Sequence, residues 1–259
     1  MPTAIRSGVK LIALGLFSLG VYGFLLVTAG GLAVIRRVRG RPVSTGHWRT
    51  RIFRRWARGV AALVGLRVEV RGVPPRPPFI LVSNHLSYVD VILLGGQLSS
   101  VFVAKAEVDR WPFVGALCRS VDTVFIDREI KRDIPRVTER LQSILADGRG
   151  VVLFPEGTST KGDGVLPFRP GLLDEAARSG RPVSYASLTY RTLGGSPPAH
   201  QVVCWWGDMP FGKHLLRLMG LPGFEAILTF GGEPIRESDR KLLATRLQRA
   251  VQRQFQTVA

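Results

Sequence analysis

Residues 79–90 read FILVSNHLSYVD, and in this stretch a polar segment follows directly on an apolar run. A short apolar run of this kind is consistent with a buried strand. The polar segment holds His85 and, five positions later, Asp90. Histidine exchanges protons near neutral pH, and a carboxylate on its second ring nitrogen fixes the tautomer and strengthens the base. The stretch therefore predicts a strand that ends in a candidate general-base pair, with a helix cap or other satisfied polar pair as the ordinary alternative.

Further strands and helices alternate on both sides of this stretch. Strands are predicted at 67–71, 79–83, 101–104, 123–126, 151–154, 183–190, 201–206 and 226–230, and helices near 89–98, 134–147, 171–179 and 240–255. Such alternation favours an α/β domain with a mostly parallel sheet flanked by helices. We expect residues 66–259 to form this domain and residues 1–65 to form a membrane anchor followed by an interfacial helix.

The anchor is predicted from Leu11 to Ile35, a segment of 25 residues without a charge. That length is enough to cross a hydrocarbon core of about 30 Å. Basic residues are more frequent after the segment than before it, which favours a catalytic domain on the cytoplasmic side of the inner or plasma membrane. A bend at Gly30 and Gly31 would instead give a re-entrant hairpin, and a cleaved signal peptide is the weaker alternative.

A second membrane signal lies between Arg51 and Gly65. One side of this predicted helix is apolar and the other is basic, with Phe53, Trp56, Val60 and Val64 on the first and Arg51, Arg54, Arg55 and Arg58 on the second. The pattern predicts a helix in the membrane interface with Trp56 at headgroup depth. The alternative is an amphipathic helix that docks on the protein core.

The composition is strongly basic, with a net charge of +17. This charge implies anionic partners: membrane phosphates, an acidic carrier protein, CoA or nucleic acid. Nucleic acid is disfavoured because the basic residues are spread along the chain and an uncharged segment of 25 residues is out of place in a nucleic-acid-binding protein. Two cysteines indicate neither a disulfide framework nor a zinc cluster, and apolar or aromatic residues separate His200, Cys204 and His214. We therefore expect no metal and no bound cofactor.

A second motif, FPEGT at 154–158, also follows an apolar run. Asn-His-x-Ser-x-x-Asp, followed 70 residues later by Phe-Pro-Glu-Gly-Thr, resembles the glycerophospholipid acyltransferase family, particularly its lysophosphatidate acyltransferase branch. The segments 103–105, 111–115, 124–128 and 181–184 resemble further family blocks, so that the resemblance covers about residues 70–190. The first and third motifs, in this order and spacing, carry most of its specificity.

The resemblance implies a role for each motif residue. His85 would take the proton from a lysophospholipid hydroxyl as it attacks the thioester of acyl-CoA or acyl-carrier protein, and Asp90 would orient the imidazole. Gly157 and Thr158 would offer donors to the headgroup or to the developing oxyanion. Glu156 would either contact substrate or hold the turn in shape. The two cations implied for headgroup binding are Lys105 and Arg128, although Arg128 is also consistent with a solvated surface charge.

Two departures from the family pattern put the acceptor in question. Many lysophosphatidate acyltransferases have arginine after Glu-Gly-Thr, where this chain has Ser159, and a hydroxyl does not replace a guanidinium on a phosphate monoester. Lys161 and Arg169 are nearby cations that would compensate. The second departure is the fourth block, which lacks its usual second proline. The sequence narrowly favours 1-acyl-glycerol-3-phosphate, giving phosphatidate, over another lysolipid such as lyso-ornithine lipid. A membrane lipid hydrolase or lipid-binding protein is the remaining alternative, and no Gly-x-Ser-x-Gly elbow supports hydrolysis.

Overall fold

Seven strands form one mixed, mostly parallel sheet in the order β1-β7-β6-β2-β5-β3-β4. The computed structural model describes all residues except 1, 40–45, 113, 128–132 and 259. The strands are β1 (Leu66–Arg71), β2 (Ile80–Ser83), β3 (Ser100–Lys105), β4 (Val124–Ile126), β5 (Gly150–Leu153), β6 (Val183–Thr192) and β7 (Phe224–Phe230). Only the β6–β7 pair is antiparallel among these described strands. The predicted sheet type is confirmed.

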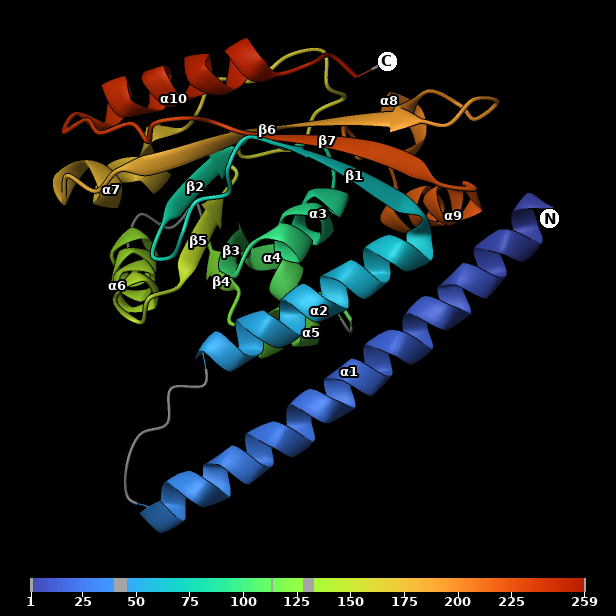
Figure 1. Cartoon of the computed structure of the whole chain (residues 1–259), viewed down its shortest axis with the longest axis horizontal. Helices are drawn as coiled ribbons and strands as arrows, with labels where there is room; N and C mark the ends of the chain where they lie inside the picture. Colours follow the sequence, from blue (N-terminus) through green and yellow to red (C-terminus); the bar gives the residue numbers. More distant parts are fainter. Residues whose placement is uncertain (1, 40–45, 113, 128–132, 259) are drawn as a thin grey trace.

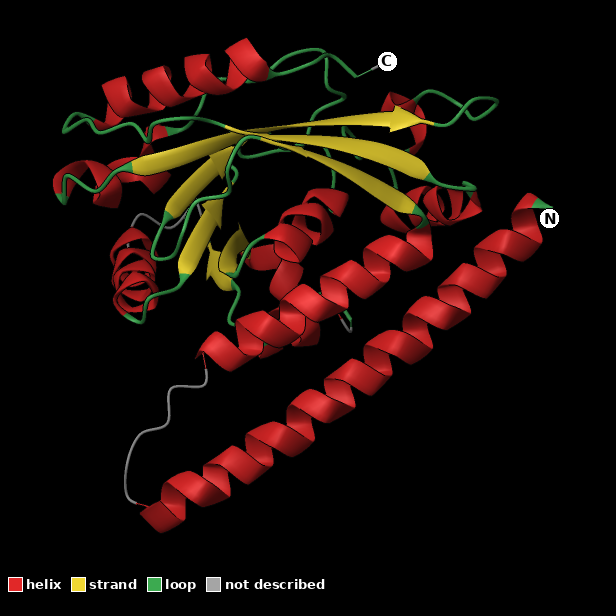
Figure 2. Cartoon of the chain, in the orientation of Figure 1, coloured by secondary structure: helices red, strands yellow, loops and turns green. Residues whose placement is uncertain are grey.

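Helices cover both faces of the sheet (Figures 1 and 2). They are α1 (Thr3–Arg39), α2 (Gly46–Val64), α3 (Val89–Gln97), α4 (Ala106–Asp109), α5 (Val114–Ser120), α6 (Asp133–Ala146), the 3-10 turn η1 (Pro170–Leu173), α7 (Asp174–Arg178), α8 (Ala199–Val202), α9 (Phe211–Gly220) and α10 (Arg240–Gln254). Successive residues of a strand face opposite sides. Accordingly, Leu81 packs in the core shared with α2 and α3, whereas Ile80 and Val82 pack in the core shared with α6 and α10.

The predicted strand at 201–206 is wrong. The chain forms α8 there and then a loop, in which the Trp205 amide donates to the Leu86 carbonyl at 2.8 Å. Val202, Val203 and Cys204 are buried as expected for a core run, but a buried run of this length does not distinguish strand from helix or loop. The other predicted strands are present, and the predicted helix at 171–179 is divided between η1 and α7.

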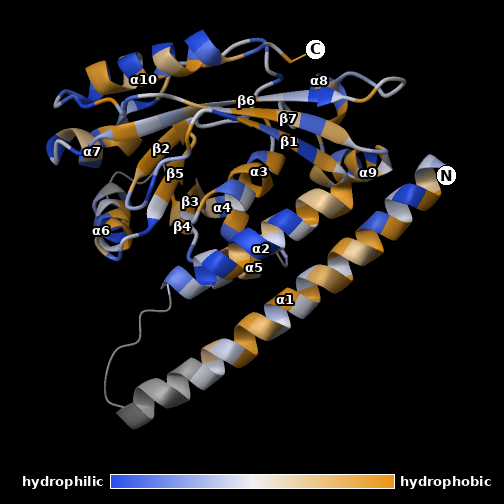
Figure 3. Cartoon of the chain, in the orientation of Figure 1, coloured by the Kyte–Doolittle hydropathy of each residue, from blue (hydrophilic) through white to orange (hydrophobic). Residues whose placement is uncertain are grey.

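The N-terminal helix α1 is continuous through Gly30 and Gly31, so the bend considered there is absent. Residues Thr3–Gly31 are long and apolar enough to cross a membrane, and Figure 3 shows their apolar character. One side of this part of α1 docks on the domain, where Lys10 Nζ donates to the carbonyls of Val64 and Leu221 at 2.8 Å each. The other side is exposed and apolar, with Ile5, Val9, Ile12, Leu16 and Leu19.

Helix α2 docks on the core with its apolar side, which corrects the expectation that this side lies in the membrane interface. Trp56 is 9% exposed, and its indole nitrogen donates to Ser18 Oγ of α1 at 3.1 Å. Phe53 packs so closely on α3 that a Cβ on Gly95 would lie 2.4 Å from its ring. The apolar stripe therefore closes the core against α3, and the Trp56 indole is covered by α1.

The basic side of α2 stays at the surface, where two of its arginines also terminate α3. Arg58 Nε donates to the Gly96 carbonyl at 2.7 Å and Arg54 Nε reaches the same oxygen at 3.4 Å. A cation at a helix C-terminus compensates its unpaired carbonyls and its dipole. Arg51 and Arg55 are exposed. The arginine side of α2 thus remains open to an anionic surface, although its apolar side does not.

Candidate active site

His85 and Asp90 form a hydrogen-bonded pair just past the end of β2. His85 Nδ1 lies 2.7 Å from Asp90 Oδ2, and the side chains are 22% and 0% exposed. The five-residue spacing closes because α3 begins at Val89 and carries Asp90 in its first turn. The predicted contact between these two side chains is present. The imidazole is the part of the pair that solvent reaches.

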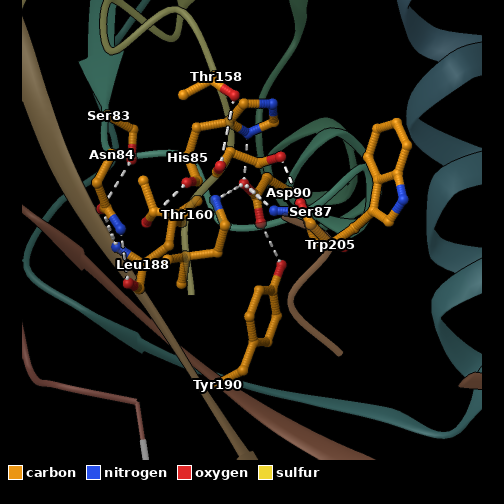
Figure 4. Close-up of polar contacts among 12 residues, drawn as sticks. Ser83, Asn84, His85, Ser87, Asp90, Thr158, Thr160, Leu188, Tyr190 and Trp205 are labelled. Carbon is orange, nitrogen blue, oxygen red and sulfur yellow. Dashed lines mark hydrogen bonds and ion pairs between the residues drawn. The ribbon is translucent and has the colours of Figure 1, made fainter. Parts of the chain in front are cut away.

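Backbone and side-chain donors surround the Asp90 carboxylate (Figure 4). Oδ2 also accepts from the amides of Leu86 at 2.7 Å and Ser87 at 3.0 Å, and Oδ1 accepts from the Tyr190 hydroxyl at 2.7 Å. A buried carboxylate stays charged only where such donors replace water. Sequence reasoning missed Tyr190, because it lies on β6, 100 residues further along the chain.

Asn84 ties the start of the loop that carries His85 to the same strand. The β2–β6 ladder ends at Ser83 opposite Ala186, and the Asn84 side chain then continues it. Its Nδ2 donates to the Leu188 carbonyl at 3.0 Å, and its Oδ1 accepts from the Leu188 amide at 2.8 Å. The amide side chain thus takes the place of the next ladder residue and fixes where the loop leaves the sheet.

The second motif meets the first because β5 lies beside β2, with Val82 opposite Leu153. The Phe154 ring stacks on His85 with centroids 4.2 Å apart and planes 19° from parallel. The Thr160 amide then donates to the His85 carbonyl at 2.9 Å. The carboxyl ends of two parallel strands therefore bring both motifs together, as expected for the site of an α/β sheet.

The turn after Phe154 requires glycine, since Gly157 has φ of 81°. The Gly157 amide donates to the Phe154 carbonyl at 3.2 Å, which occupies the backbone donor that the sequence assigns to substrate. Thr158 is exposed, and its hydroxyl reaches the Ser159 carbonyl only at 3.5 Å. Of these two residues, Thr158 is the one that is exposed to solvent.

Glu156 lies beneath this turn and is 3% exposed. Its carboxyl oxygens approach the amides of His85 and Leu166 but form no hydrogen bond of good geometry with the described residues. Burial raises the pKa of Glu156 to about 8, and the nearby Asp90 charge acts in the same direction. Of the two roles considered for Glu156, this position favours shaping the turn over contact with substrate.

Ser159 does not present its hydroxyl to solvent as a free donor. Its Oγ donates to the Trp205 carbonyl, and the Trp205 amide donates to the Leu86 carbonyl. Ser159 therefore joins the second motif to the loop after α8, and through it to the first motif. At this position, the side-chain hydroxyl connects two loops.

Of the remaining predicted cations, those in the described part of the chain lie at the surface. Lys161 is exposed and pairs with Asp163 at 2.9 Å, and the Arg169 side chain is also exposed. Lys105 is exposed at the end of β3, opposite Ile126 of β4. Arg128, two positions after Ile126, lies outside the described residues. Strand β3 lies beside β5 and runs parallel to it, so its carboxyl end is at the same edge of the sheet as the two motifs. Lys105 therefore lies at that edge.

Two of the three residues considered as metal ligands are buried, and one of them has hydrogen-bond partners of its own. His214 faces the Tyr88 hydroxyl and the Cys204 carbonyl, each at 3.0 Å, and burial lowers its pKa. Cys204 is fully buried, which raises the pKa of its thiol. Among the described residues, no three His, Cys, Asp or Glu side chains are grouped to hold a metal ion.

Residues 67–186, which contain both motifs, match the family model described as Acyltransferase. A lyso-ornithine lipid O-acyltransferase of Rhodobacter capsulatus is 34% identical over 87% of this chain and 85% of that protein, and one of Pseudomonas aeruginosa is 34% identical over 92% and 88%. A 1-acyl-sn-glycerol-3-phosphate acyltransferase of Neisseria meningitidis is 33% identical over 60% and 62%. The crystal structure of PlsC, a 1-acyl-sn-glycerophosphate acyltransferase of Thermotoga maritima, shares the fold with a TM-score of 0.57, at 22% identity, over 94% of this chain and 97% of that one.

Proposed function

Because this chain belongs to the Acyltransferase family, we propose that it moves a fatty acyl group from a thioester donor to the free hydroxyl of a lysolipid in a membrane. The donor would be acyl-CoA or acyl-carrier protein. The observation that carries the proposal is the 2.7 Å contact between the partly exposed His85 imidazole and the fully buried Asp90 carboxylate. A base with this support is suited to activating a hydroxyl.

In the proposed reaction, His85 accepts the hydroxyl proton as the oxygen attacks the thioester carbonyl. The C–O bond forms, the C–S bond breaks, and the imidazolium returns the proton to the leaving thiolate. Asp90 stabilises the positive charge on the ring during this step, in the manner of a catalytic triad but without a covalent intermediate. The exposed Thr158 hydroxyl is the proposed donor to the developing oxyanion or to the headgroup, while Glu156 and Gly157 shape the turn that carries it.

For the acceptor, three observations favour a lysolipid without a phosphate monoester, such as lyso-ornithine lipid. Ser159 stands where an arginine would grip phosphate, and its hydroxyl already donates to Trp205. Lys161 already pairs with Asp163. The relatives that match over most of the chain are named for lyso-ornithine lipid. The motifs alone narrowly favour lysophosphatidate as the acceptor. Together with these three observations, the preferred acceptor becomes lyso-ornithine lipid.

Lysophosphatidate remains the second candidate, because the motif set and the Neisseria relative favour it. In that case Lys105, Arg128 and the exposed Arg169 would supply the positive charge that Ser159 lacks. A guanidinium is the better partner for a phosphate because it binds two oxygens at once. Activity with lysophosphatidate should therefore depend more strongly on a cation at this edge of the sheet than activity with lyso-ornithine lipid.

We further propose that the exposed apolar side of α1 inserts into the membrane and that the domain faces the cytoplasm. Helix α2 lies beside α1 and carries exposed Arg51 and Arg55. If the docked part of α1 crossed the bilayer upright, these arginines would enter hydrocarbon at about 2.5–3.5 kcal/mol each. This cost favours an α1 that lies along one leaflet, with the α2 arginines at the level of anionic headgroups.

The test is acyl transfer by purified protein from labelled acyl-CoA to lyso-ornithine lipid or lysophosphatidate, supplied separately and in competition. We expect transfer that requires an acceptor and prefers lyso-ornithine lipid. A Ser159→Arg variant should shift the ratio of specificity constants toward lysophosphatidate by roughly 10-fold or more, the worth of one charge-assisted contact. Thioester cleavage that is independent of any acceptor would contradict the proposed function. A wild-type preference for lysophosphatidate would overturn only the choice of acceptor.

A further inference from the structure

We infer that Tyr190 is a positioning residue of the catalytic pair: its hydroxyl holds the second oxygen of Asp90 and thereby sets how strongly Asp90 binds the protonated His85. This inference rests on the proposed function, because it concerns the same reaction. It extends the site from two loops to a third element, the strand β6. Among the described residues, the Tyr190 hydroxyl donates to Asp90 and not to His85, so any effect on His85 must pass through Asp90.

The hydroxyl is held on a rigid support. Tyr190 is fully buried, and its backbone pairs with Ala226 in the antiparallel β6–β7 ladder. Its ring meets the buried Phe224 edge to face, with centroids 6.1 Å apart. A side chain fixed on both its backbone and its ring loses little further freedom when it donates a hydrogen bond. The 2.7 Å contact with Asp90 Oδ1 therefore fixes the rotation of the carboxylate.

The two oxygens of Asp90 have unequal surroundings. Oδ2 faces His85 and accepts from the amides of Leu86 and Ser87, whereas the recorded partner of Oδ1 among the described residues is Tyr190 alone. If the hydroxyl were removed, Oδ1 would be a buried anionic oxygen without its donor. The carboxylate would become more basic and would hold a proton on His85 more tightly.

Tyr190 is suited to remain a donor throughout the working pH range. Burial and the adjacent Asp90 charge both raise its pKa well above the ordinary value. The titratable groups that surround Asp90 are His85 and Tyr190 in direct contact and Glu156 and Cys204 nearby, and the last two also have raised pKa values. Of these side chains, Tyr190 is the one that donates to Oδ1.

A purely structural role for Tyr190 would be to attach β6 to the catalytic loop. Asn84 already does this with two hydrogen bonds to Leu188, two residues earlier on the same strand. Loss of the Tyr190 hydroxyl should therefore leave the loop attached and the protein folded. A matched control is available at Thr189, which is 3% exposed and whose hydroxyl donates to the Gln256 carbonyl at 2.6 Å, away from the pair.

The experiment compares Tyr190→Phe with Thr189→Val in full-length protein, using acyl-CoA and the preferred lysolipid. Each variant loses one buried hydroxyl from β6. For Tyr190→Phe we expect kcat to fall by roughly 10-fold, with both KM values within about 2-fold of wild type. The acidic limb of kcat/KM should move to higher pH, because His85 releases its proton less readily. Thr189→Val should show neither change.

A second readout does not depend on acyl transfer. In nuclear magnetic resonance spectra of isotope-labelled histidine, with His85→Ala used for assignment, the His85 ring should titrate at higher pH in Tyr190→Phe than in wild type. An unchanged titration would overturn the inference, and so would a Thr189→Val variant that reproduces both kinetic changes. If wild-type protein transferred no acyl group, the proposed function would fail, while the titration would still decide the role of Tyr190.

Discussion

Replacing Glu156 by glutamine should make the stability of the protein less sensitive to rising pH. Glu156 is buried beneath the catalytic turn, and burial raises its pKa from 4.5 to about 8. Between these two values the folded protein keeps a proton on this carboxyl that the unfolded chain has lost. The contribution of this proton to the free energy of unfolding is therefore fully present at low pH and is lost as the pH rises toward 8. Glutamine is neutral at every pH and removes this loss.

The magnitude follows from the size of the shift. A change from 4.5 to about 8 corresponds to a total on the order of 5 kcal/mol, at about 1.4 kcal/mol per pH unit. Between pH 6 and pH 8 the wild type should lose about 2 kcal/mol relative to Glu156→Gln. For a chain of this size 1 kcal/mol moves Tm by roughly 2–4 °C, so the difference in Tm should grow by roughly 4–9 °C.

The assay is thermal unfolding of both proteins in one detergent across pH 5–9, followed by tryptophan fluorescence. Glu175→Gln is the control, because Glu175 is also buried but its carboxyl accepts from Gln142 at 3.0 Å. The control should keep the wild-type dependence on pH. Parallel curves of Tm against pH for wild type and Glu156→Gln would refute the reasoning and show that Glu156 ionises in the fold as it does in the unfolded chain.

The remaining predictions concern the catalytic pair and the membrane surface. His85→Ala should lower the initial rate of acyl transfer by about 10²–10⁴, with a nearly unchanged Tm, because the ring is partly exposed and its loss removes a base more than a core contact. Asp90→Asn should lower the initial rate by a similar factor and should also lower Tm, since Oδ2 accepts hydrogen bonds from two backbone amides. Activity near that of the wild type in either variant would contradict the mechanism. Neutralising Arg51 and Arg55 together with glutamine should weaken binding to anionic vesicles roughly 30-fold at low salt, with a smaller salt dependence, whereas glutamine at Arg249 and Arg253 on α10 should not.

Much of the sheet could be predicted because its strands are short apolar runs between turn residues. The β2 and β5 runs are strands as predicted, and they bring the two polar motifs that follow them side by side. The strand prediction at 201–206 failed because Val202 to Cys204 are as apolar as a strand, yet they enter the core from α8 and the loop after it. The prediction that the apolar side of α2 lies in the membrane interface failed for a similar reason, since an apolar side indicates burial but does not show whether protein or lipid buries it.

The partners of the proposed catalytic residues could not be predicted, for a different reason. Sequence spacing connects His85 with Asp90 through one helical turn, but Tyr190 reaches Asp90 only because β6 lies beside β2. The role of Ser159 was likewise hidden, because its acceptor is the backbone of Trp205, which carries no sequence signal. Contacts between residues close in sequence can be predicted from their spacing, whereas contacts across the sheet depend on the order of the strands.

That dependence on β6 has a consequence for the timing of synthesis. Asp90 leaves the ribosome about 5–20 s before Tyr190, at ordinary rates of translation. During that interval the nascent chain already contains the histidine motif, but neither Leu188 nor Tyr190 exists to hold it. A chain that stalls before residue 183 would therefore contain the histidine motif without the contacts that hold it in the folded protein. Biosynthesis thus delays the assembly of the site until the strand that supports it has emerged.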